Sequence, residues 1–214
     1  MQTARQRCAA AVVLLHPAYA RAQTHMQLTI VGTNGPLFLV DTSAEAVLFL
    51  STHYPQFAKR LLGWQLSVEE VYCLQSCKGH DAAAQLGNVS DVAVVFESAS
   101  AAAQYQELWK TYAIDCCIYS QLTLCHGYKL RHGSSFGANY IGYQDVNRHG
   151  ECLFFAGPLT DLEQVRAVRV AHSVGKDAVQ VLVVTDGAGV ALTRLGGSRA
   201  ATGATRHRKL RRKE

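Results

Sequence analysis

The cysteines and histidines between residues 116 and 132 form the densest group of side chains with metal-binding or nucleophilic chemistry. They are Cys116, Cys117, Cys125, His126 and His132, and zinc accepts both residue types as ligands. Adjacent cysteines on a helix point about 100° apart, and the surrounding apolar pattern turns Cys116 inward. We therefore interpret the cysteines as small apolar core residues, and the sequence predicts no metal site and no cofactor. The GxGxxG and GxxxxGK[ST] patterns are also absent, which disfavours a nucleotide-hydrolysing enzyme.

Charge is distributed unevenly along the 214 residues, whose formal net charge is +5. Residues 199–214 carry +6 and residues 1–40 carry +3, whereas residues 41–198, with 11 basic and 15 acidic side chains, carry −4. The C-terminal basic run predicts an arm that neutralises phosphates or directs the chain to the nucleus. A solubilising tail is the alternative. Because residues 41–198 are acidic overall, an anionic partner would have to be bound there by local lysines and arginines.

Four linked segments in the second half of the chain carry a resemblance to a known family. They are IYSQLTLCHGYKLRHG (118–133), FGANYIGY (136–143), RHGECLFF (148–155) and VRVAHSVGK (168–176). In this order they resemble the helix and strand, the FGADFxVY strand, the histidine-bearing strand start and the VRxAHSVRK helix end of the tRNA-splicing (tRNA-intron) endonucleases. The loop before His149 is shorter than the family pattern and lacks its Pro-Gly-Asp, and Gly175 stands where a basic residue usually precedes the lysine.

The resemblance implies that Tyr143, His149 and Lys176 form a catalytic triad. A ribonuclease of this kind needs no metal, because the 2′-hydroxyl of RNA is the nucleophile. Tyr143 is then the base that accepts the 2′-hydroxyl proton, and His149 is the acid that protonates the departing 5′-oxygen. Lys176 stabilises the charge of the transition state. Because free phenols have pKa values of about 10, a nearby cation such as Lys176 is expected to favour the phenolate.

The function that the resemblance implies is that of a catalytic subunit of a tRNA-splicing endonuclease. It would cut precursor tRNA at an exon–intron junction and leave a 2′,3′-cyclic phosphate and a 5′-hydroxyl. Lys129, Arg131 and Arg148 are the expected RNA-binding residues beside the triad. Expected partners are precursor tRNA and other endonuclease subunits, in a homo-oligomer or a hetero-oligomer. The loop around Asp186 lies where the family places an acidic docking loop, and the strand at 190–195 offers an edge for pairing.

Two alternatives to a catalytic tRNA-splicing subunit stay open. One is a noncatalytic structural subunit of the same complex, which the complete triad disfavours. The other is a metal-dependent nuclease of the related restriction-like fold, with Asp145 and Glu151 near Lys176 as candidate metal ligands. The D-x(n)-ExK arrangement typical of such nucleases is absent.

Strands, turns and capped helices are expected to position these side chains. In the first half, alternation and turn residues predict a hairpin of strands 28–32 and 37–41, helices from Ser43 to about 62 and over 67–77, and a strand over 91–97. In the second half, they predict one long helix over 105–126, a helix over 160–175 and strands at 128–133, 138–143, 151–157, 178–184 and 190–195.

The order of these elements predicts an α/β (α+β) chain of two small domains. Residues 27–100 form a small N-terminal α/β domain, and residues 104–195 form the nuclease domain. By resemblance, the nuclease domain has the mixed sheet flanked by helices of tRNA endonucleases and restriction endonucleases. The Ser-Ala run at 98–103 is the expected boundary. Residues 1–26 are interpreted as an extension and residues 196–214 as a disordered basic tail.

Cysteine usage and hydropathy bear on the compartment. The seven cysteines are odd in number and form no CxxC pair, which favours a reducing, intracellular compartment. No apolar run near the N-terminus approaches the roughly 18 residues of a spanning helix, so no membrane segment is predicted. The first 25 residues are interpreted as a dispensable extension before Met26, with a mitochondrial presequence or a weak secretory signal as alternatives. For a eukaryotic source we expect the nucleus, with the cytoplasm or the mitochondrial surface as alternatives.

Overall fold

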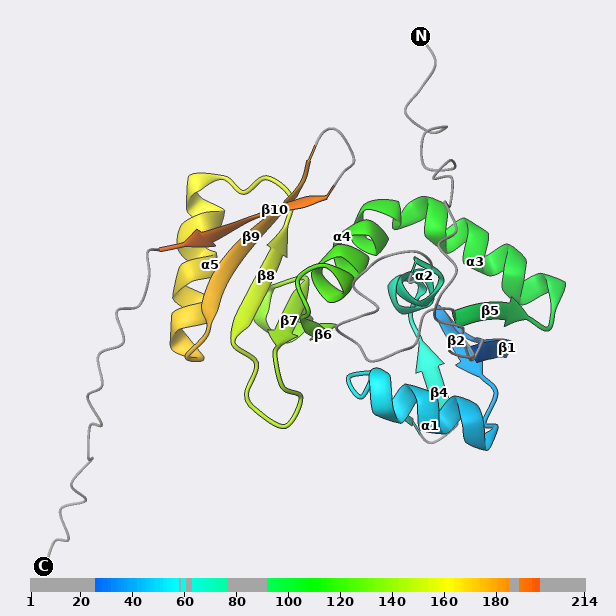
Figure 1. Cartoon of the computed structure of the whole chain (residues 1–214). Helices are drawn as coiled ribbons and strands as arrows, with labels where there is room; N and C mark the ends of the chain where they lie inside the picture. The colour runs from blue at the N-terminus through cyan, green and yellow to red at the C-terminus, as the bar shows by residue number, and fades with distance from the viewer. Residues whose placement is uncertain (1–25, 58, 61–62, 77–91, 185–188, 197–214) are drawn as a thin grey trace, which may run out of the picture.

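The computed structural model describes residues 26–57, 59–60, 63–76, 92–184 and 189–196. Within them the chain forms an α+β fold of five α-helices and two mixed five-stranded sheets (Figure 1), which confirms the predicted fold class. The extension over residues 1–25, the basic run at 199–214 and the loop around Asp186 lie outside the described residues. In the described part of the chain, no helix has the length and apolar character needed to span a membrane.

The first sheet is built on the predicted hairpin of β1 (Met26–Asn34) and β2 (Leu37–Val40), which pair antiparallel. Gly35 turns the chain between them with a φ of 58°, a conformation that glycine adopts without strain. The remaining strands are β3 (Lys59–Arg60), β4 (Gly63–Leu66) and β5 (Val92–Phe96) in the order β3-β4-β2-β1-β5, with β5 parallel to β1.

Helix α1 (Ala44–His53) is shorter than predicted, because the helix from Ser43 was expected to continue to about residue 62. Tyr54 leaves the helical region with a φ of −130° and a ψ of 53°. It precedes Pro55, whose ring disfavours helical backbone at the preceding residue. The prediction of a longer helix was therefore wrong.

Helix α2 (Val68–Ser76) begins with the predicted capping box. The backbone N–H of Ser67 donates to Glu70 Oε2 at 2.8 Å, and the backbone N–H of Glu70 donates to Ser67 Oγ at 3.4 Å. These two hydrogen bonds satisfy N–H groups that the first turn of a helix leaves without a partner.

The predicted long helix over 105–126 is wrong, since the chain forms α3 (Ala99–Thr111) and α4 (Ala113–Leu124) with a break at Tyr112. The two helices pack on different partners. Tyr105 of α3 contacts the rings of Phe38 and Phe96 in the first sheet. Tyr119 of α4 instead meets the ring of a tyrosine in the second sheet, with centroids 5.5 Å apart. One straight helix cannot serve both sheets, so the chain bends.

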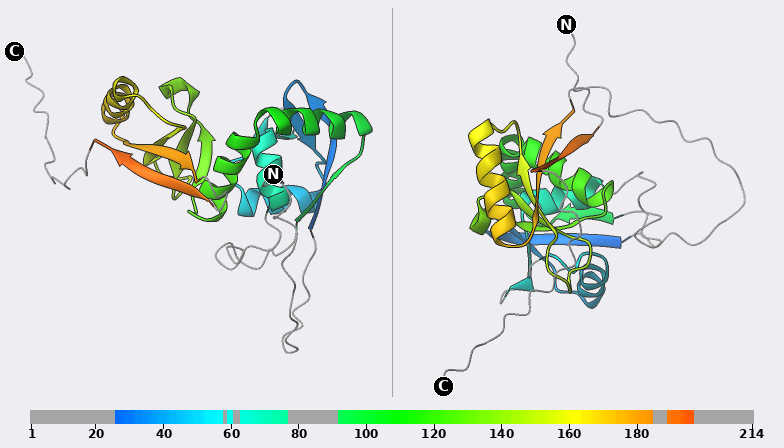
Figure 2. Two further views of the ribbon diagram at one scale, coloured as in Figure 1. Left: turned by 90° about the horizontal axis from the view of Figure 1, so that it is seen from above. Right: turned by 90° about the vertical axis from the view of Figure 1, so that its left-hand side faces the viewer.

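The second sheet has the order β10-β9-β8-β7-β6 and is mixed, because only β8 and β9 run parallel. Helix α5 (Asp161–Ser173) connects β8 to β9 and covers one face of the sheet, while α4 covers the other (Figures 1 and 2). The mixed sheet flanked by helices is thus as predicted. Its strands are β6 (Lys129–His132), β7 (Tyr140–Tyr143), β8 (Cys152–Ala156), β9 (Asp177–Val183) and β10 (Val190–Leu195).

The start of α5 carries the second predicted capping box. Thr160 N donates to Glu163 Oε2 at 2.8 Å, and Glu163 N donates to Thr160 Oγ1 at 3.4 Å. The backbone N–H of Thr160 holds the pKa of the Glu163 carboxyl below its usual value, because this hydrogen bond favours the ionised form. The start of the helix that leads to Lys176 is therefore fixed in place.

Buried side chains form one large core and a smaller one. The large core joins both sheets through α4 and includes Leu28, Phe38, Leu74, Tyr119, Leu122 and Phe154. The smaller core lies between α5 and the second sheet and includes Ile141, Leu153, Phe155, Ala167 and Ala171. Because α3 packs on the first sheet and α4 on both, the predicted domain boundary at 98–103 stays a proposal.

Candidate active site

Tyr143 is the last residue of β7, and strand alternation decides which face of the sheet it occupies. Tyr140 faces the α4 side, where its hydroxyl donates to the carbonyl of Asp115 at 3.4 Å and burial raises its pKa. Tyr143 lies three residues further on, and successive strand residues point to opposite faces. It is half-buried and packs against the smaller core around Ile141, on the α5 side. Of the two tyrosines in this strand, only Tyr143 is available for chemistry.

Lys176 is positioned by the end of α5, where the chain forms a Schellman motif. The backbone N–H of Gly175 donates to His172 O at 3.2 Å, and that of Lys176 donates to Ala171 O at 2.8 Å. Gly175 has a φ of 72°, a left-handed conformation that glycine adopts without strain. The side chain of Lys176 then reaches the neighbouring strand, where Nζ donates to the backbone carbonyl of Gly150 at 2.5 Å.

His149 is exposed in the turn between β7 and β8. Asp145 organises this turn, since its carboxylate accepts the backbone N–H of Asn147 at 2.9 Å and its carbonyl accepts that of Arg148 at 3.1 Å. Arg148 Nε lies 3.7 Å from Asp145 Oδ2, and its side chain is 81% exposed. An imidazole at this position is accessible to a substrate.

Gly150 contacts two of the three predicted catalytic residues, Tyr143 and Lys176, and directly follows the third, His149, in the chain. Its carbonyl accepts the hydrogen bond from Lys176. A Cβ built on Gly150 would lie 3.2 Å from both Cε1 and Cζ of Tyr143 and 2.6 Å from Ile141 Cγ2. The phenol of Tyr143 and the ammonium group of Lys176 thus lie at one backbone position, next in the chain to His149. Sequence reasoning did not single out Gly150, although its place directly after His149 was a visible signal.

Replacing Gly150 with alanine is expected to lower the free energy of unfolding by about 1–3 kcal/mol, because the methyl group overpacks the contact with Ile141. It is also expected to displace the ring of Tyr143 and reduce any activity of the site. Urea unfolding followed by circular dichroism measures the first effect. Gly32→Ala is the matched control, since its nearest neighbour would be Leu39 Cδ1 at 3.9 Å. Equal stability of the two variants would contradict the prediction.

Two of the three predicted RNA-binding residues flank Tyr143. Lys129 lies directly opposite Tyr143 in the β6–β7 ladder. The guanidinium carbon of Arg131 lies 5.5 Å from the centroid of the Tyr143 ring. Arg148 is close to the site only as the neighbour of His149, and it pairs with Asp145. That these residues bind RNA stays a prediction.

The side chains considered for metal binding differ in how deeply they are buried. Cys116 is in the core, where burial raises the pKa of its thiol to about 12, whereas Cys125 is exposed. Across the described ranges, no three His, Cys, Asp or Glu side chains form a group with the geometry to hold a metal ion. The acidic residues near the site have other surroundings, since Asp145 contacts Arg148 and Glu151 is exposed.

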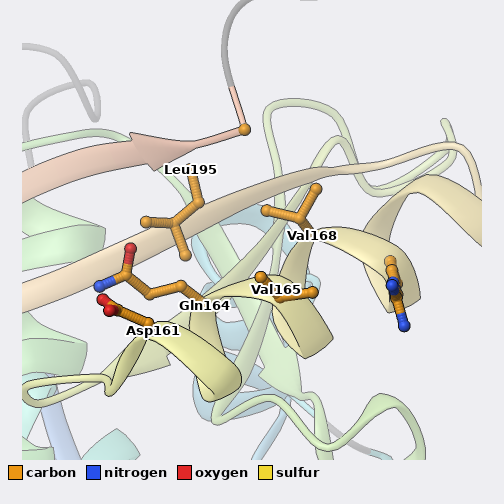
Figure 3. A pocket seen from close by; sticks show the side chains of 7 residues that line it. Asp161, Gln164, Val165, Val168 and Leu195 are labelled. Atoms are coloured by element: carbon orange, nitrogen blue, oxygen red, sulfur yellow. The ribbon is translucent and has the colours of Figure 1, made fainter.

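Two hollows lie near the second sheet, and neither is lined by the three predicted catalytic residues. The first, of about 490 Å³, lies at the edge of β6 and is lined by Gln56, Phe57, Trp64 and Arg131, among others. The second, of about 480 Å³, lies between α5 and the end of β10. Figure 3 shows Val168 of α5 beside Leu195 of β10, and Val165 below them, in this second hollow.

One family model matches the part of the chain that runs from the start of α4 to the start of β10. Residues 112–190 match the family model described as tRNA intron endonuclease, catalytic C-terminal domain. The match begins at Tyr112, where α3 ends and α4 follows, and it contains Tyr143, His149 and Lys176. No curated protein matches the chain.

Proposed function

We propose that this chain, which belongs to the tRNA-splicing endonuclease family through its C-terminal half, is a catalytic subunit that cuts precursor tRNA at an exon–intron junction. The family acts on tRNA in multi-subunit complexes. The observation that supports a catalytic role is that Gly150, the residue after His149, contacts both Tyr143 and Lys176. A subunit that served assembly alone would have no need to keep a tyrosine and a lysine in contact with the residue that follows a histidine.

The proposed reaction uses a nucleophile that the RNA already contains. Tyr143, as phenolate, takes the proton of the 2′-hydroxyl, whose oxygen attacks the adjacent phosphorus. The new bond from the 2′-oxygen to phosphorus forms as the bond from phosphorus to the 5′-oxygen breaks. His149, as imidazolium, gives its proton to that 5′-oxygen. The products are a 2′,3′-cyclic phosphate and a 5′-hydroxyl, and one proton is accepted and one released by the site.

Lys176 is suited to stabilise the charge that develops on phosphorus oxygens in this reaction. Its ammonium group is already oriented by the carbonyl of Gly150, so it needs little rearrangement when the transition state forms. An ammonium group has three donor hydrogens. The hydrogen bond to Gly150 therefore leaves donors for a phosphate oxygen.

The RNA itself is proposed to be held by local cations. Lys129 and Arg148 are the candidates for phosphate contacts, because Lys129 lies opposite Tyr143, Arg148 precedes His149, and both side chains are at least partly exposed. The basic run at 199–214, outside the described residues, would add attraction that weakens with salt. For a eukaryotic source we further propose that this run directs the chain to the nucleus, with the cytoplasm or the mitochondrial surface as alternatives.

The test of the proposed function is cleavage of end-labelled, intron-containing precursor tRNA in the presence of EDTA. The full chain is assayed alone and with candidate partner subunits, and the ends of the fragments are analysed. Cleavage at an exon–intron junction that leaves cyclic phosphate and 5′-hydroxyl ends is the expected result. Fragments with other ends, or activity that appears only after magnesium is restored, would favour the metal-dependent nuclease. Cleavage that persists when Tyr143, His149 and Lys176 are all replaced would favour a structural subunit.

A further inference from the structure

Arg131 is the cation whose charged group faces the ring of Tyr143. The guanidinium carbon of Arg131 lies 5.5 Å from the centroid of that ring, within the roughly 6 Å range of cation–π contacts. Arginine is suited to this position because its planar guanidinium stacks on aromatic faces, which a lysine ammonium does not.

The register of the sheet explains why Arg131 contacts this ring. Arg131 pairs with Ile141 in the β6–β7 ladder, and Tyr143 lies two residues further along the same strand and on the same face. Such diagonal neighbours are within reach of long side chains. The next residue, His132, lies on the opposite face and has its ring 6.1 Å from that of Tyr140.

Lys176 and Arg131 have different partners. Lys176 Nζ donates to the carbonyl of Gly150. Among the described residues, no carboxylate forms an ion pair with Arg131. Gly150 also limits the ring of Tyr143, since it lies too close to Cε1 and Cζ for a larger residue to fit without movement. The ring is therefore confined by Gly150 and contacted by the guanidinium of Arg131.

We propose that Arg131 is a positioning residue that acts through Tyr143, holding its ring in place and favouring the negative charge that the phenol oxygen carries as the base. This inference rests on the proposed function, because it assigns Arg131 to the step in which Tyr143 takes the 2′-hydroxyl proton. It differs from a role in RNA binding, in which the guanidinium would contact a phosphate and contribute to affinity.

The two roles predict different kinetics. If Arg131 acts through Tyr143, Arg131→Ala lowers the single-turnover rate at saturating RNA by about tenfold and changes the KM for RNA little. Arg131→Lys, which keeps the charge, restores part of the rate. If Arg131 contacts a phosphate instead, the alanine variant raises the KM for RNA and leaves the rate at saturating RNA unchanged. The slope of log affinity against log salt concentration then falls by about one, the value for one lost phosphate contact.

The decisive measurement is a double-mutant cycle on the full chain in its active complex. In a Tyr143→Phe background, a residue that acts through the Tyr143 hydroxyl has no further effect on the cleavage rate, so Arg131→Ala is expected to change the double variant less than twofold. Full additivity of the two substitutions would overturn the proposal, as would a change confined to KM. Lys110→Ala is the charge-matched control, since Lys110 lies on α3 and forms an ion pair with Glu107 at 2.8 Å.

The Tyr143→Phe variant separates the role of Arg131 from the proposed function of the chain. If the wild-type complex cuts and Tyr143→Phe slows cutting strongly, the proposed function holds whatever Arg131→Ala does. If Tyr143→Phe does not change the cleavage rate, Tyr143 is not the base, and the proposed role of Arg131 is wrong as well. Circular dichroism of each variant establishes that a rate change does not arise from unfolding.

Discussion

His149→Ala is expected to slow single-turnover cleavage of precursor tRNA by about 10²–10⁴-fold, the range typical of a lost general acid. The physical reason is that the 5′-oxygen must leave as an alkoxide when no proton is supplied. His149 is exposed, and no side-chain hydrogen bond to it is found in the described structure. Its replacement should therefore leave the fold intact. The measurement is the rate at saturating enzyme, compared with the unfolding midpoint of the same preparation.

A modified substrate tests the assignment of His149 as the acid. When sulfur replaces the 5′-oxygen at the cleavage site, the leaving thiolate needs no protonation, so the loss in His149→Ala should largely disappear. Tyr143→Phe serves as the matched comparison, because a lost base is not compensated by a better leaving group. If the sulfur substrate restored both variants equally, or neither, the assignment of acid and base to these residues would be wrong.

Replacing Lys176 with methionine is expected to lower the cleavage rate by about 10²–10³-fold, the effect of removing one preorganised donor to a developing oxyanion. Methionine retains the length of the side chain but cannot donate to the carbonyl of Gly150. The charge on the phosphorus oxygens then has no fixed counter-charge from this residue. Single-turnover cleavage at saturating RNA measures the loss.

Lys176→Arg separates the charge from the geometry. An arginine keeps the charge and can donate to Gly150, but it presents a planar fork in place of a compact ammonium group. Its activity should lie between those of the wild type and Lys176→Met. The backbone contacts of Lys176 with Ala171 are unaffected by either change, so both variants should fold. Equal rates for wild type and Lys176→Met would remove Lys176 from the reaction.

The sequence predicted most of the second sheet because its elements have strong local signals. The Thr160 capping box, the glycine after α4 and the short apolar strands were all found where expected. The sequence did not predict where α1 ends or that residues 99–124 form two helices. Both depend on tertiary packing or on a single proline, which the helical period of apolar residues does not reveal.

The candidate site was predictable only in part, for a related physical reason. Residue types and the family resemblance were enough to name Tyr143, His149 and Lys176. They were not enough to show that Gly150 holds Lys176, or that Arg131 contacts Tyr143. Those contacts depend on strand register and on the left-handed turn at Gly175, which set directions that spacing along the chain does not contain.

Helix α4 lies between the two sheets (Figures 1 and 2). We therefore expect its packing to couple the two halves of the chain during unfolding. Cys116, Ile118, Tyr119 and Leu122 are each at most 1% exposed, and α4 contacts α2 as well as β6, β9 and β10. A fragment cut at residue 112 would keep the family-matched region but would lose α2 and uncover this apolar surface. Loss of the N-terminal sheet is therefore expected to loosen the strand that carries Tyr143 as well.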